Sequence, residues 1–89
     1  SAESALYGRV VTEGMFGIRP TGFRSFTLCP QLPQEWNQMS LRKIKAFGAD
    51  FDIEVERIKG QTIRVVVKKA GKAVLNKKVA NGSSLNCKL

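Results

Sequence analysis

Apolar and charged side chains alternate between Asp50 and Glu56, and this two-residue period constrains the fold more than any other feature of the 89-residue chain. Phe51, Ile53 and Val55 carry the apolar side chains, and carboxylates occupy the positions on either side of them. In an extended strand, such a period turns one face towards a core and the other towards water. The run therefore predicts a half-buried strand of an antiparallel sheet.

A second alternating run follows and determines how the two strands should pair. Its apolar residues are Ile63, Val65 and Val67, and we predict a turn at residues 59–61 before it. Both apolar sets occupy odd positions, so an antiparallel pair must place odd positions opposite odd positions. We therefore expect three cross-strand pairs, two of them between opposite charges: Ile58 with Thr62, Glu56 with Arg64, and Asp52 with Lys68.

Glycine, proline and asparagine divide most of the remaining chain into short segments. Pro30 and Pro33 make residues 30–36 an extended connection, because proline fixes its own φ and restricts the residue before it. The imperfect alternation of residues 41–47 indicates a bulge or an edge strand. Together these signals predict four further strands, over residues 23–29, 41–47, 72–79 and 85–89.

The first part of the chain gives weaker signals. Residues 4–11 are predicted to form a short N-terminal helix, because Ser4 can cap it and the apolar residues that follow lie near helical spacing. Closely spaced glycine and proline predict an irregular loop over residues 14–22. Together, about six short strands with frequent turns predict the all-β class, as one small antiparallel β-sandwich domain that spans residues 1–89.

Composition excludes several classes of function. The chain contains no histidine, which removes histidine-based triads, general bases and metal ligands. It has no apolar stretch of roughly 20 residues, so we expect no contact with a membrane. It begins at Ser1 without a basic and apolar leader, and we interpret it as a mature product or an excised fragment. We expect no cofactor, no metal, no enzymatic activity of its own and a monomeric isolated domain.

The net charge of +8 is concentrated in the second half of the chain, because all seven acidic residues precede Arg57. Clustered lysine and arginine could bind an anionic glycan or a nucleic acid. Nucleic acid is disfavoured, because single-strand binders interleave cations with stacking rings and all seven aromatic residues also precede Arg57. Lysines on an edge strand also prevent unwanted sheet addition, which is a purely structural explanation.

The carboxylates at positions 50, 52, 54 and 56 could in principle bind calcium or act as an acid/base pair. We favour the interpretation that they face the basic strand that follows, because they lie along one straight strand. Trp36 could form a flat platform for a sugar ring, although a lone loop tryptophan more often closes a core. Cys29 and Cys87 could form one disulfide or remain free buried thiols.

Several short motifs occur in an order that resembles a known family. They comprise four groups: Gly17, Ile18, Arg19 and Pro20; Phe23 and Phe26; Pro30, Leu32, Pro33 and Trp36; and Gly48, Phe51, Ile53 and Val55. This order resembles the C-terminal β-sandwich domain of six-hairpin glycosidase-like enzymes, which include α-rhamnosidases, trehalase-like enzymes and disaccharide phosphorylases. The resemblance covers about half of the chain.

The resemblance implies a non-catalytic accessory domain of a carbohydrate-active enzyme. Its partner would be the catalytic α/α toroid domain of the same polypeptide, together with carbohydrate, and a periplasmic or secreted location would follow. No catalytic residue transfers to this chain, because the family's acid and base belong to the toroid. Phe16 and Ile18 lie in a glycine-rich loop that a small sandwich cannot bury easily, so they and Arg19 are candidate interdomain contacts. The alternative is that this loop folds back onto its own core.

Overall fold

The computed structural model describes residues 3–6, 9–22, 24–46 and 48–89, with side chains described from Gly14 onward except at positions 23, 46 and 47. Within these residues the backbone forms nine strands and one 3₁₀ turn, η1 (Glu13–Phe16). The strands are β1 (Glu3–Leu6), β2 (Arg9–Thr12), β3 (Arg19–Gly22), β4 (Ser25–Leu28), β5 (Gln38–Ala46), β6 (Ala49–Lys59), β7 (Thr62–Lys69), β8 (Lys72–Ala80) and β9 (Leu85–Lys88).

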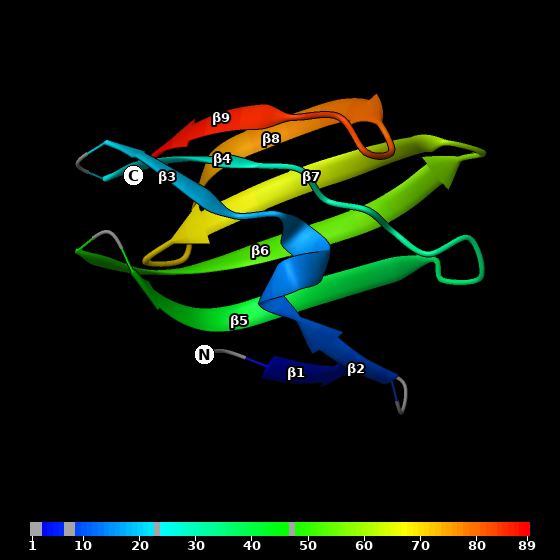
Figure 1. The fold of residues 1–89 in the computed structure, drawn as a ribbon, viewed down its shortest axis with the longest axis horizontal. Helices are drawn as coiled ribbons and strands as arrows, with labels where there is room; N and C mark the ends of the chain where they lie inside the picture. The colour runs from blue at the N-terminus through cyan, green and yellow to red at the C-terminus, as the bar shows by residue number, and fades with distance from the viewer. Residues whose placement is uncertain (1–2, 7–8, 23, 47) are drawn as a thin grey trace.

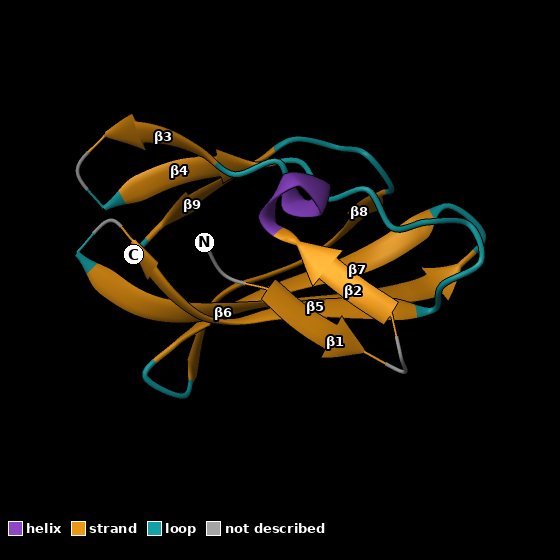
Figure 2. Cartoon of the chain, turned by 60° about the horizontal axis from the view of Figure 1, so that its bottom comes forward, coloured by secondary structure: helices purple, strands orange, loops and turns teal. Residues whose placement is uncertain are grey.

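Two antiparallel sheets face each other as a sandwich, which confirms the predicted all-β class (Figures 1 and 2). One sheet has the strand order β3-β4-β9, and the other has the order β5-β6-β7-β8. The β1–β2 hairpin lies against β5 at the edge of the larger sheet. The described strands therefore outnumber the six or so that turn signals predicted. No helix within the described residues is long and apolar enough to cross a membrane.

The core lies between the two sheets, where the inward faces of their strands meet. Phe26 of β4 stacks on Phe51 of β6, with ring centroids 5.2 Å apart, and this pair joins the two layers. The odd-numbered apolar residues of β6 and β7 are buried, as the alternation predicted. The buried apolar core consists of Phe16, Phe26, Leu28, Leu32, Met39, Leu41, Ile44, Phe51, Ile53, Val55, Ile63, Val65, Val67, Leu85 and Cys87.

The register of β6 against β7 confirms two of the three predicted pairs. Glu56 lies opposite Arg64, and Asp52 lies opposite Lys68. The third pair is wrong, because Lys59 and not Ile58 lies opposite Thr62. A register shift between positions 57 and 59 tightens the turn around Gly60, which adopts a φ of +57°, and leaves Ile58 41% exposed. The extra residue is a β-bulge beside the turn.

The N-terminal region differs from its prediction in two places. The predicted helix at residues 4–11 is wrong: Glu3–Leu6 and Arg9–Thr12 pair as an antiparallel hairpin. Val10 and Val11 are β-branched, and such residues favour strands over helices. The predicted loop at residues 14–22 contains part of η1 and the whole of β3, so an irregular path there is also wrong.

The β5 strand has both features that its imperfect alternation allowed. It is an edge strand of the larger sheet, and its register shifts between Leu41 and Ile44. Lys43 in this bulge has a φ of +57°, and its backbone N–H donates to Asp52 Oδ1 at 2.7 Å. The carboxylate on β6 therefore holds the bulge in place. The predicted bounds extended to Phe47, and those of the strand at 23–29 began at Phe23, both of which lie outside the described residues.

The last strand leaves the sheet of its predecessor. Beyond the turn at Asn81 and Gly82, β9 pairs with β4 and completes the smaller sheet. Leu85 lies opposite Leu28, and Cys87 lies opposite Phe26. This crossing joins the two layers through the backbone at the C-terminal end of the chain (Figure 1).

Both cysteines are free thiols in the structure. Cys29 follows Leu28, so it is offset by three residues from the position opposite Cys87. That offset amounts to about 10 Å along a strand, whereas the Cα atoms of bridged cysteines lie less than about 7 Å apart. The Cys29 thiol instead donates to the Gly82 carbonyl at 3.1 Å. Of the two alternatives for these residues, the geometry supports free thiols.

Two polar side chains fix the proline-rich connection over residues 29–37 to the rest of the fold. Arg57 of β6 donates from Nε to the Trp36 carbonyl at 3.2 Å, from Nη2 to the Pro33 carbonyl at 2.9 Å, and from Nη1 to the Gly60 carbonyl. Asn81 exchanges two hydrogen bonds of 2.8 Å with the backbone of Leu32. The connection is therefore held from two sides by bonds that span long sequence separations.

Candidate functional site

The outward face of the larger sheet carries the principal candidate site, a shallow groove across three strands. Inward positions of β6 and β7 are odd, so even positions point outward. The groove encloses about 300 Å³. Its lining comes from β5, β6 and β7 and consists of Gln38, Met39, Ser40, Arg42, Glu54, Val55, Glu56, Arg64 and Val66.

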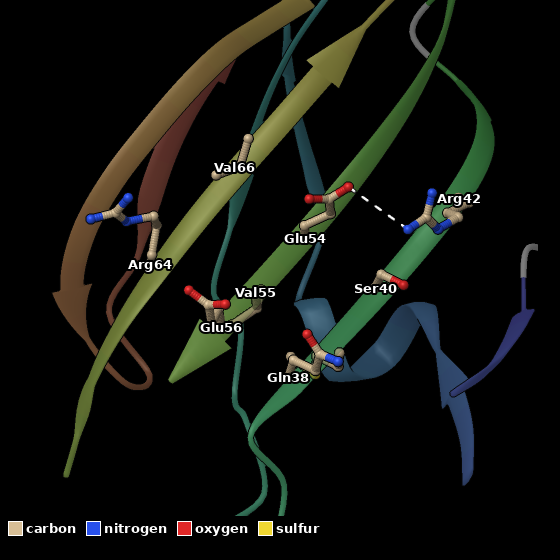
Figure 3. A pocket seen from close by; sticks show the side chains of 9 residues that line it. Gln38, Ser40, Arg42, Glu54, Val55, Glu56, Arg64 and Val66 are labelled. Carbon is tan, nitrogen blue, oxygen red and sulfur yellow. Dashed lines mark ion pairs between the residues drawn. The ribbon is translucent and has the colours of Figure 1, made fainter. Parts of the chain in front are cut away.

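The charged side chains of the groove alternate across the strands (Figure 3). Arg42 stands on β5, Glu54 and Glu56 stand on β6, and Arg64 stands on β7. Two guanidinium groups and two carboxylates thus contribute no net charge to the lining. Short side chains between them, Ser40 and Val66, keep the surface hollow.

Glu54 lies at the centre of this charge arrangement. Its Oε2 is 3.5 Å from Lys68 Nζ and 3.9 Å from Arg42 Nη2. The Arg42 side chain is 61% exposed, so this longer contact contributes little free energy. Lys68 therefore pairs diagonally with Glu54, while its register partner Asp52 accepts the backbone N–H of Lys43.

Two polar groups of the groove are buried. Ser40 is only 7% exposed and is the one buried polar residue that the described part of the chain contains. The Nε atom of Arg64 is also buried, and it has no hydrogen-bond partner within the described residues. A buried unpaired donor carries a desolvation cost.

The acidic row of β6 does not form a metal site. Within the described residues there is no group of three or more carboxylates or thiols that could hold a metal ion. Three of the four carboxylates instead lie beside or opposite cations of β7, the strand that follows, as the favoured interpretation of the row expected: Asp52, Glu54 and Glu56. Only Glu54 and Glu56 contribute to the groove.

The four residues singled out from the sequence lie elsewhere. Phe16 has no exposed area, so the expectation that its loop leaves it available to a partner is wrong, and the loop does fold back onto the core. Ile18 is half-buried against that core, and Arg19 is exposed on β3. Trp36 is half-buried against the core, which matches the core-closing alternative more closely than an exposed sugar platform.

The basic half of the chain forms β7, β8 and β9. Lys72, Lys77 and Lys78 are exposed on β8, an edge of the larger sheet. Lys77 lies opposite the buried Val65, so it occupies the inward face of this edge strand. Inward lysines of this kind block the addition of a further strand.

Sequence reasoning missed the groove, although a signal for it existed. The register placed even positions of β6 and β7 on one face, and Glu56 opposite Arg64 was part of that prediction. The contribution of β5 was missed because the predicted strand began at Leu41 whereas β5 begins at Gln38, and because the register shifts between Leu41 and Ile44. Gln38, Ser40 and Arg42 could therefore not be assigned to the same face from alternation alone.

Comparison with protein families, with curated proteins and with solved structures found no match for the chain.

Proposed function

We propose that this chain is a non-catalytic accessory domain of a carbohydrate-active enzyme of the glycoside hydrolase type. In this proposal it packs against a catalytic α/α toroid domain of the same polypeptide. The proposal rests on the resemblance to the C-terminal sandwich of six-hairpin glycosidase-like enzymes. One structural observation carries it further: the motif residues Gly17 and Pro30 lie at one joint of the sandwich, and the buried apolar motif residues belong to one core.

That joint lies where η1 meets the start of the proline-rich connection. Gly17 has a φ of +58°, and a Cβ at this position would come within 3.0 Å of the Cys29 carbonyl. Backbone bonds of 2.9 Å and 3.0 Å tie Cys29 and Gln31 to the carbonyls of Phe16 and Met15. The motif glycine is therefore needed for a close approach of two backbone segments.

The apolar motif residues fill the space beneath this joint. Phe26, Leu32, Phe51 and Ile53 are all buried, and Pro30 is fully buried. Motif residues with such positions specify a shared sandwich architecture rather than a reaction centre. This supports the transfer of a structural role from the resembling family and gives no support for the transfer of catalysis.

The chemistry of the acidic residues agrees with a non-catalytic role. Glycosidase carboxylates face each other across a cleft, about 5 to 10 Å apart, with the substrate between them. Glu54 and Glu56 point out of the same face of one strand, and Glu54 is occupied by Lys68 and Arg42. Their arrangement is not that of a glycosidase acid/base pair.

The proposal is tested with a family toroid domain whose own C-terminal sandwich has been deleted. Adding this chain should raise the thermal unfolding temperature of that domain and form a one-to-one complex in sedimentation. Arg19→Glu should weaken the complex, because Arg19 is the exposed cation within the motif, whereas the matched charge reversal Lys72→Glu on the other sheet should not. The isolated chain should hydrolyse none of the oligosaccharides in an assay panel. Turnover by the purified chain, or failure to associate with any family toroid domain, would overturn the proposal.

A second candidate function is a binding module for an anionic glycan or a nucleic acid, favoured by the exposed lysines of β8. Phosphate or sulfate contacts release counterions, so affinity should fall steeply as salt concentration rises. Binding to heparin and to single-stranded RNA across a salt series measures this directly. Tight binding at physiological ionic strength, abolished by Lys72→Glu with Lys78→Glu, would favour this candidate over the accessory domain.

A further inference from the structure

The groove on the larger sheet has features that the accessory role does not require. A solvated sheet face needs neither a hollow of about 300 Å³ nor a buried hydroxyl on its floor. Ser40 supplies that hydroxyl from β5, and Arg64 supplies a buried unpaired Nε atom from β7. These two groups lie on opposite sides of the acidic strand β6 (Figure 3).

The charges of the lining select among ligand classes. Arg42 and Arg64 together balance Glu54 and Glu56, so a charged ligand would meet as much repulsion as attraction. A neutral ligand with many hydroxyl groups meets no such conflict, because each hydroxyl can donate to a carboxylate and accept from a guanidinium group. The volume lies at the small end of the range for ligand pockets, which suits one ring rather than an extended chain.

The contacts that close the groove are weak enough to open. Arg42 and Glu54 are 3.9 Å apart, the Arg42 side chain is 61% exposed, and ion pairs with such an exposed partner are weak. Arg42 can therefore turn towards a ligand at little cost. Glu54 keeps its contact with Lys68, which holds the carboxylate in position.

We propose that this groove binds one neutral sugar unit of a glycan, with Glu54 and Glu56 accepting hydrogen bonds from its hydroxyls. Ser40 and Arg42 donate to hydroxyl oxygens of the sugar from the β5 side, and the Val66 methyl groups contact the apolar face of the ring. Binding is weak, because the groove has no aromatic platform among its lining residues. The inference follows from the groove itself and does not depend on the chain being part of an enzyme.

The experiment is a titration of the isotope-labelled 89-residue chain with neutral methyl glycosides, followed by amide and side-chain NMR shifts. The panel includes rhamnosides, glucosides and galactosides at up to high millimolar concentrations. At least one glycoside should shift Ser40, Glu54, Glu56 and Val66 together. Added salt should leave the affinity unchanged, because a neutral ligand releases no counterions.

Substitutions within and outside the groove sharpen the result. Glu56→Gln and Ser40→Ala should each weaken binding by up to about tenfold, the equivalent of one lost hydrogen bond. Asp50→Asn removes a carboxylate of the same strand that does not line the groove, and it should leave binding unchanged. Thermal unfolding of each variant confirms that it folds.

Three outcomes would overturn the proposal. The first is an absence of shifts for every neutral glycoside. The second is a shift map centred on Trp36 rather than on the groove. The third is a response of the groove residues to heparin alone. None of these outcomes bears on the docking of the chain to a toroid domain, so the two proposals can fail independently.

Discussion

Arg57 should contribute more to stability than any other charged residue whose contacts the structure describes. Its guanidinium group donates to the carbonyls of Pro33, Trp36 and Gly60, while its own backbone N–H donates to the Asn37 carbonyl at 2.8 Å. Arg57→Ala leaves this last bond intact and removes the three side-chain bonds. The connection over residues 29–37 then loses the side-chain bonds that fix Pro33 and Trp36 to β6.

The magnitude follows from the burial of the acceptors. The bonds to Pro33 and Trp36 are partly buried, whereas the bond to Gly60 is exposed and contributes little. At about 1 to 1.5 kcal/mol for each partly buried bond, Arg57→Ala should lower the free energy of unfolding by about 2–3 kcal/mol. For a domain of this size, that loss corresponds to a fall in Tm of roughly 10–20 °C.

Urea unfolding followed by the fluorescence of Trp36, the only tryptophan, measures the loss. Arg57→Lys should recover less than half of it, because an ammonium group cannot reach carbonyls on three sides with a planar fork. Arg19→Ala serves as the control, since an exposed arginine should change stability by no more than about 0.5 kcal/mol. If Arg57→Ala costs under 1 kcal/mol, or if lysine restores full stability, the reasoning about this guanidinium group is refuted.

Three further predictions concern other parts of the fold. Gly17→Ala should destabilise the chain by about 2 kcal/mol or more in thermal unfolding, because the positive φ and the 3.0 Å approach to Cys29 both oppose a Cβ. Gly71 also has a positive φ but a Cβ there meets nothing within 4 Å, so Gly71→Ala should cost only about 1 kcal/mol, and equal losses for the two variants would contradict this. Burial raises the pKa of the Cys87 thiol, so iodoacetamide should label Cys29 before Cys87 in mass spectrometry, and simultaneous labelling would argue against the burial. Because the thiol ionises more easily in the unfolded chain, the free energy of unfolding should fall as pH rises above 9.0. Lys77→Val should cause concentration-dependent self-association in light scattering, because it removes the inward charge of the β8 edge. Lys78→Thr on the outward face should leave the chain monomeric, and an unchanged mass for Lys77→Val would count against the edge argument.

Alternation predicted the part of the fold that it controls directly. The pairs Glu56 with Arg64 and Asp52 with Lys68 follow from matching two apolar faces, and both are observed. The error at Ile58 arose because matching the two apolar faces tells only that odd positions lie opposite odd positions. It does not tell how many residues form the turn. A bulge next to Gly60 changes that number without moving any apolar side chain off its face.

The features that depend on distant segments were beyond sequence reasoning. The apolar residues of β9 predicted a strand but not its partner, because alternation within one strand does not specify which strand pairs with it. The burial of Phe16 depends on bonds between η1 and the proline-rich connection, which no local pattern encodes. The groove arises in the same way, since its two buried polar groups, Ser40 and Arg64, belong to strands that meet only through β6.

The pairing of β4 with β9 also determines when this chain can become stable. Ser25 finds its partner at Lys88, so the middle strand of the smaller sheet stays half-paired until residues 85–88 have been synthesised. Contacts of such large sequence separation carry a high entropic cost and slow the folding reaction. The hairpins of the larger sheet can form early from neighbouring segments, yet the core lacks Leu85 and Cys87 until β9 pairs with β4. The smaller sheet is therefore the part of the core that closes last.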